Sequence, residues 1–170
     1  MQSTKKYPAL FQFLKIAENA ALADGDLDYI RHKSPEGGLD TIGYGHKLTH
    51  SEAIKGAVYG FDIEGFDIDA AEAVLCNDIS RHEAIVRLNS GAYGYSFDQL
   101  DTRRQEMLIE INFNVGDVCR KFPTFTKAVY MGDEETMKKE HHRHYYDIDG
   151  VRHPLTRRNE LFEATWFDSE

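Results

Sequence analysis

The chain has 170 residues, 41% hydrophobic and 29% charged, which is typical of a single globular domain. Its formal net charge of −9 argues against nucleic acid as the main partner, because binding phosphates requires a basic surface. We find no apolar run long enough to span a membrane, and we expect no membrane insertion. The two cysteines, Cys76 and Cys119, are too few for a disulfide framework or a zinc site, so we expect two small buried apolar residues.

The first predicted helix covers residues 7–23, where apolar side chains recur at helical spacing. Lys15 and Glu18 interrupt these apolar residues, so the segment does not resemble a signal peptide, and we expect synthesis in the cytoplasm. Glu18 lies near the end of the helix, on or beside its apolar stripe. Such a carboxylate is either a boundary residue that reaches water or a partly buried general acid, and the pattern alone favours the first.

Short strands are predicted next, at residues 27–31, 41–45 and 47–49. Glycines alternate with β-forming residues from Ile42 to Gly45, and a glycine in a strand usually marks a close approach of another group. We interpret this stretch as the floor of a cleft. A structural turn that merely tolerates glycine is an equally good interpretation of the spacing.

The rest of the chain is predicted to be mostly helical. One turn is expected at residues 51–55, a loop at 56–65, and a helix at 67–88 that would be about 30 Å long. Further helices are expected at 98–115, 123–130, 133–146 and 156–165. The run His141-His142-Arg143-His144 has no acidic or cysteine ligand at matching spacing, so we expect three exposed imidazoles and no metal site.

The order of these features resembles the phage-type lysozymes, the T-even bacteriophage lysozyme group of glycoside hydrolase family 24. The segment FLKIAEN is similar to the family's first helix around its catalytic glutamate, which places that role on Glu18. The segment TIGYGH is similar to its most specific short motif and places its active-site threonine on Thr41. Later segments also match in order: 98–104, 111–116, 143–146, 156–159 and 165–166.

The resemblance implies an α+β, mostly helical, lysozyme-like fold in one domain over residues 1–170. A hairpin lobe would span about 18–65, a connecting helix about 67–88, and a helical lobe about 96–167 together with the first helix at 7–23. It also implies a peptidoglycan-degrading muramidase that needs no cofactor and acts as a monomeric endolysin. Such a protein is made in the host cytoplasm and reaches the cell wall after release or delivery by another component.

The resemblance assigns further roles residue by residue. Phe113 and Asn114 match positions that contact the glycan, and Arg157 matches a basic neighbour of the catalytic glutamate. His46 and Asp78 match a buried structural pair that ties the hairpin to the connecting helix.

The chain departs from the family pattern at Ser34, which stands where the second catalytic carboxylate is expected. Serine can hydrogen-bond a water molecule but cannot act as a general base near neutral pH. A nearby carboxylate is one replacement: Glu36 lies at the turn and could reach, Asp40 should face away from Thr41, and Asp26 or Asp28 lies in the preceding loop.

A serine at this position also fits a different reaction or a loss of activity. The sugar's own hydroxyl could attack, as in lytic transglycosylases that work with a single glutamate. Hydrolysis could also be weak or lost, leaving a protein that binds glycan or a protein partner. The acidic charge fits either a wall reached by other means or a non-catalytic role, because basic proteins are drawn to anionic cell walls.

Overall fold

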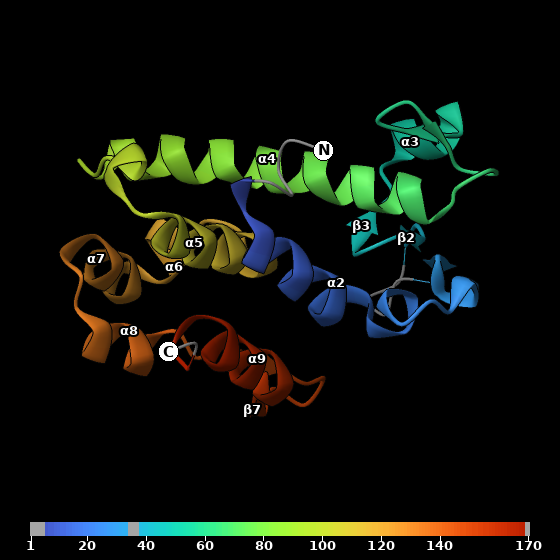
Figure 1. Cartoon of the computed structure of the whole chain (residues 1–170). Coiled ribbons are helices and arrows are strands. Elements are labelled where there is room, and N and C mark those ends of the chain that lie inside the picture. Colours follow the sequence, from blue (N-terminus) through green and yellow to red (C-terminus); the bar gives the residue numbers. More distant parts are fainter. Residues whose placement is uncertain (1–5, 34–37, 169–170) are drawn as a thin grey trace. The chain divides into compact units, whose positions relative to one another are not determined.

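The computed structural model describes residues 6–33 and 38–168 (Figure 1). The chain divides into two compact units, residues 1–81 and 82–170, and the boundary falls inside the longest helix, α4 (Ile68–Ala92). Helix α2 (Pro8–Ala23) belongs to the first unit. Within the described residues, no helix combines the length and the hydrophobicity needed to cross a membrane.

Helix α2 follows the apolar periodicity of its sequence, but its backbone is interrupted. It buries one face through Leu10, Phe11, Phe13, Leu14 and Leu22. Asn19 has φ −155° and ψ 77°, which is not helical, so the regular part of the helix ends at Glu18. The predicted helix at 7–23 is therefore present with a kink that periodicity did not indicate.

The first sheet has three strands in the order β1 (Arg31–His32), β2 (Thr41–Ile42) and β3 (His46–Lys47), and neighbouring strands are antiparallel. The predicted strand at 27–31 is wrong at its start, where Leu27–Tyr29 forms the 3-10 helix η1. The Asp26 side chain caps η1 by accepting a hydrogen bond from the Asp28 N–H, which favours a turn over a strand.

The predicted strand at 41–45 is also too long. Ile42 pairs with His46, so Gly43, Tyr44 and Gly45 form the loop of the β2–β3 hairpin. Gly43 and Gly45 have φ of +58° and +85°, values that a strand does not contain and that glycine adopts without strain.

The rest of the first unit contains one helix, a second hairpin and the start of α4. Helix α3 (His50–Lys55) begins at a reciprocal capping pair, Thr49 with Glu52. The predicted loop at 56–65 contains the antiparallel pair β4 (Ala57–Val58) and β5 (Phe61–Asp62), which two-residue strands are too short to reveal by alternation. Asp67 caps α4 by accepting the Ala70 N–H at 2.8 Å.

Helices form most of the second unit. After α4 come η2 (Phe97–Gln99), α5 (Thr102–Val115), α6 (Val118–Lys121), α7 (Pro123–Met131), α8 (Glu134–Glu140) and α9 (Thr156–Trp166). Helix α5 begins later than predicted because Asp101 caps it through the Arg104 N–H. The fully buried side chains include Met107, Leu108, Ile109, Ile111, Phe125 and Phe162, and both cysteines are free and buried, as expected.

The predicted helix at 133–146 is wrong beyond Glu140. Residues His144–Tyr146 form strand β6, which pairs antiparallel with β7 (Arg152–Pro154). Asp147 organises the connecting turn, because its Oδ1 accepts the N–H groups of Asp149 and Val151.

The expectation of three exposed imidazoles is wrong for His141, which is completely buried, whereas His142 and His144 are exposed. His141 stacks on Phe162 with ring centroids 4.9 Å apart. Burial and the neighbouring His142 lower the pKa of His141 to about 4, so its ring is neutral at pH 7.

A buried ion cluster lies in the second unit. Glu110 of α5 is fully enclosed, and Arg143 is only 1% exposed. The Arg143 Nη1 lies 2.7 Å from Glu110 Oε1, and the Arg158 Nε of α9 lies 2.8 Å from the same oxygen. Asn159 also bonds both the N–H and the carbonyl of Arg143. The cluster joins α5, α9 and the segment before β6.

Candidate active site

Glu18 lies at the end of the regular part of α2, and the next residue attaches that end to the hairpin. The Asn19 amide donates hydrogen bonds to the carbonyl of Tyr29 at 2.8 Å and to the carbonyl of Gly43 at 3.0 Å. Its Oδ1 accepts the N–H of Leu22 at 3.1 Å. Asn19 is 7% exposed, so these bonds are shielded from water. The amide therefore fixes the hairpin loop beside Glu18.

The hairpin loop and Glu18 are in direct contact. A Cβ atom added at Gly45 would lie 2.8 Å from Oε2 of Glu18 and 3.1 Å from its Cγ. Only a residue without a side chain allows the backbone to lie this close to the carboxyl group. The sequence predicted a close approach at these glycines, and the group that approaches Gly45 is Glu18.

We expect Gly45→Ala to lower the free energy of unfolding by about 1–2 kcal/mol, because an L-residue at this positive φ is strained and its methyl group would displace Glu18. Urea unfolding measures the change. Gly60→Ala is the matched control, because Gly60 also has a positive φ, +89°, while nothing lies within 4 Å of an added Cβ there. Equal effects of the two variants would contradict the contact.

Of the other predicted catalytic residues, the structure describes only Thr41. Thr41 is buried in β2, opposite Lys47 and two residues before the hairpin loop. Ser34 and Glu36 lie outside the described residues. No role at this site is assigned to them by the geometry.

Two of the alternative carboxylates already have structural partners. Asp40 lies 3.0 Å from the Lys33 ammonium and 2.9 Å from the Arg31 guanidinium, and these bonds lower the pKa of Asp40. A lowered pKa makes a carboxylate a weaker base. Asp26 caps η1. Both are therefore poor replacements for the missing carboxylate.

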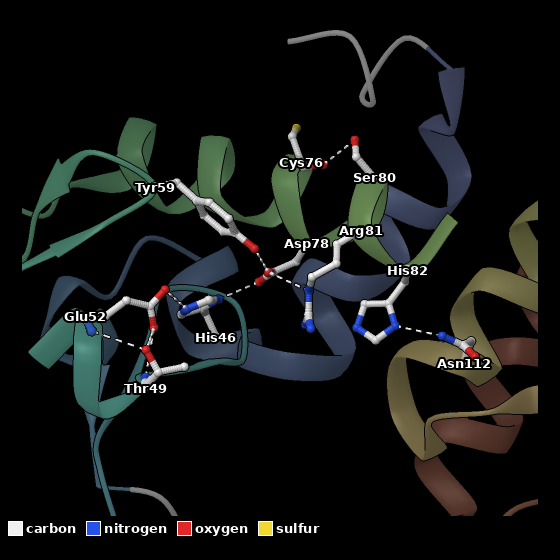
Figure 2. Close-up of polar contacts among 10 residues, drawn as sticks. All are labelled: His46, Thr49, Glu52, Tyr59, Cys76, Asp78, Ser80, Arg81, His82 and Asn112. Atoms are coloured by element: carbon white, nitrogen blue, oxygen red, sulfur yellow. Dashed lines mark hydrogen bonds and ion pairs between the residues drawn. The ribbon is translucent and has the colours of Figure 1, made fainter. Parts of the chain in front are cut away.

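His46 and Asp78 meet in a buried network of the first unit (Figure 2). The His46 Nδ1 donates to Asp78 Oδ2 at 2.8 Å, and its Nε2 lies 3.3 Å from Glu52 Oε1. The hydroxyl of Tyr59 donates to Asp78 Oδ1 at 2.8 Å. Burial and Asp78 together raise the pKa of Tyr59 to about 12. The network joins the β2–β3 hairpin to α3, α4 and the residue after β4.

We expect the stability of the chain to fall as the pH rises through the pKa of His46. Burial opposes the charged imidazolium, but the bonds to Asp78 and Glu52 outweigh it and raise the pKa. A raised pKa gives stability that is complete below the ordinary value of about 6.5 and is lost as the pH rises through the folded value. Urea unfolding at a series of pH values should show a smaller decline in His46→Gln than in the wild type.

His50→Gln is the control for this pH series, because His50 is exposed at the start of α3. Its decline with pH should match that of the wild type. An unchanged decline in His46→Gln would assign the pH dependence to other groups.

The predicted glycan-contacting residues belong to the second unit. Phe113 is half-buried and stacks on His82 with ring centroids 4.8 Å apart. The Asn112 amide donates to the same imidazole at 2.9 Å (Figure 2). Asn114 is half-buried, and Arg157 is exposed on α9. Their roles beside Glu18 and Thr41 of the first unit stay predictions.

A cavity of about 580 Å³ in the second unit was not predicted from the sequence. Its lining includes Lys121, His142, His144 and Arg152, together with aromatic rings and Glu140, and none of the predicted site residues. The Arg152 guanidinium donates to His144 Nδ1 at 3.0 Å. The cavity is thus more basic than the chain as a whole.

Comparison with known proteins identifies the fold. The muramidase domain of SpmX from Asticaccaulis excentricus aligns with a TM-score of 0.57 and 18% identity, covering 94% of this chain and 95% of that chain. No protein-family model and no curated protein sequence matches the chain. At this identity the likeness shows the fold and not the activity. The chain therefore has a lysozyme-like α+β fold that is mostly helical, as its sequence predicted.

Proposed function

We propose that the chain is a muramidase of the phage-lysozyme type, which cleaves peptidoglycan between N-acetylmuramic acid and N-acetylglucosamine. The observation that carries the proposal is the contact between Glu18 and Gly45. It brings the carboxyl group of FLKIAEN against the loop of TIGYGH, the two segments on which the resemblance to glycoside hydrolase family 24 depends. The lysozyme-like fold supports the same assignment.

In this proposal Glu18 is the general acid. It donates its proton to the glycosidic oxygen as the bond to the anomeric carbon breaks, and a nucleophile attacks that carbon from the opposite face. Asn19 and Gly45 act by positioning, because they hold the loop and the acid together. Thr41 would help to place the attacking water. Phe113 and Asn114 would contact the glycan, and Arg157 would be a basic neighbour of Glu18.

The proposal includes the way in which the enzyme reaches its substrate. An acidic protein gains no electrostatic attraction to an anionic wall. We therefore place the chain among endolysins that are released or delivered to peptidoglycan by another component, and we expect it to act as a monomer.

A single-acid lytic transglycosylase is the second candidate. Asp40 and Asp26 already have structural partners, which leaves Glu36 and Asp28 as the second carboxylate or a reaction that needs none. The muramic acid hydroxyl then attacks its own anomeric carbon, and the product carries an anhydro end.

Mass spectrometry of the products from purified sacculi tests the proposal. Hydrolysis in heavy-oxygen water should give reducing muramic ends that carry the label, whereas transglycosylation should give unlabelled anhydro ends. A folded protein, as shown by circular dichroism, that releases neither product would overturn the enzyme proposal. Sedimentation with sacculi would then test a binding module.

A further inference from the structure

Two histidines and a glutamate of the second unit point their donor atoms at one another. His141 and His142 follow α8, and Glu163 lies on α9. The Nε2 atoms of His141 and His142 lie 3.1 Å and 3.2 Å from Oε1 of Glu163. All three donor atoms lie within 4.8 Å of one another. In a tetrahedral zinc site with bonds of about 2.1 Å, donor atoms are roughly 3.4 Å apart, so small side-chain movements would suffice.

The hydrogen bond of His142 Nδ1 fixes a tautomer in which Nε2 carries a free lone pair. Its Nδ1 lies 3.1 Å from the Lys139 carbonyl, which can only accept, so Nδ1 carries the proton. The lone pair of Nε2 then faces a carboxylate oxygen. A metal ion between them would bind both this lone pair and the carboxylate oxygen. A carbonyl on the outer nitrogen is also the usual partner of a metal-binding histidine.

Packing holds the His141 ring in place. The ring is completely buried, stacks on Phe162 and contacts Phe167 at 5.5 Å between centroids. Its Nδ1 has no hydrogen-bond partner among the described residues, so the group that meets Nε2 decides where the proton of the neutral ring lies. The adjacent Arg143 is compensated by Glu110 and adds little net positive charge.

The other two side chains leave the cluster open to solvent. The side chains of His142 and Glu163 are 45% and 42% exposed. An ion could therefore enter without unfolding the unit, and water could complete its coordination.

We propose that His141 Nε2, His142 Nε2 and the Glu163 carboxylate bind one divalent transition-metal ion of the zinc class. Imidazole nitrogens with one carboxylate suit zinc, whereas magnesium and calcium prefer oxygen ligands alone. The ion links the segment after α8 to α9, and the β6–β7 hairpin lies between these two segments in the sequence. None of these three residues takes part in the proposed glycan chemistry.

Equilibrium dialysis of the full chain, free of any affinity tag and stripped with a chelator, tests the site with zinc chloride. We expect one zinc ion per chain, no binding of magnesium, and a melting temperature that rises with zinc. His142→Ala and Glu163→Gln, which change exposed side chains, should weaken zinc binding by about 100-fold or more. Cobalt should give the visible absorption of a four-coordinate ion in the wild type and not in these variants.

His144→Ala is the matched control, because His144 is exposed on β6 and is not part of the cluster. It should bind zinc like the wild type. A folded wild type that holds no more zinc than His142→Ala would overturn the proposal. Equal zinc binding by the wild type and both cluster variants would overturn it as well.

Discussion

Glu18→Gln is expected to lower the rate of peptidoglycan cleavage by about 100-fold to 10,000-fold, the range typical of losing a general acid. Glutamine has nearly the same shape and can keep the contact with Gly45, but it has no acidic proton for the leaving oxygen. Release of dye-labelled fragments from purified sacculi measures the rate.

Glu64→Gln is the control for this experiment, because Glu64 is an exposed acid of the same unit. It should cleave like the wild type. If Glu18→Gln retained the wild-type rate, another residue would be the acid, and the assignment made from FLKIAEN would be wrong.

Glu110→Gln should destabilise the chain by about 3–5 kcal/mol, the typical cost of removing one partner from a buried ion pair. The carboxylate compensates Arg143, which is 1% exposed, and Arg158. Without it, guanidinium charge remains inside the second unit. Urea denaturation followed by circular dichroism measures the loss in the free energy of unfolding.

Glu134→Gln provides the comparison, because Glu134 pairs with Arg103 while both side chains are well exposed. A solvent-exposed pair contributes about 0–1 kcal/mol. If the two variants lost similar amounts of free energy of unfolding, burial would not make the Glu110 ion pair more important for stability than the exposed pair.

The sequence predicted the elements whose apolar residues recur over several turns. Helices α2, α4, α5, α7 and α9 were found near their true positions, because each buries one face over many residues. The pairs β4–β5 and β6–β7 were missed, since strands of two or three residues show little alternation. Their pairing depends on turn residues such as Asp147 rather than on periodicity.

The sequence predicted the part of the candidate site that lies within its two short motifs. The motif FLKIAEN indicated Glu18, whose catalytic role stays a prediction, and the glycines of TIGYGH indicated the close approach that Gly45 makes to it. His46 does contact Asp78. Asn19 was missed because a buried asparagine acts through backbone carbonyls that only the folded chain supplies, although a polar residue on a predicted helix was a signal. The cluster around Glu163 was missed because its acid lies on another helix.

The two glycines of the hairpin loop constrain how this sequence can diverge. The space beside Gly45 is filled by Glu18, and the space beside Gly43 by Ala71, whose Cβ lies 3.1 Å from an added Cβ. A larger residue at either glycine requires a compensating change at a position tens of residues away. Among homologues, the loop should therefore keep both glycines and position 71 should keep a small residue, even where most of the chain has drifted.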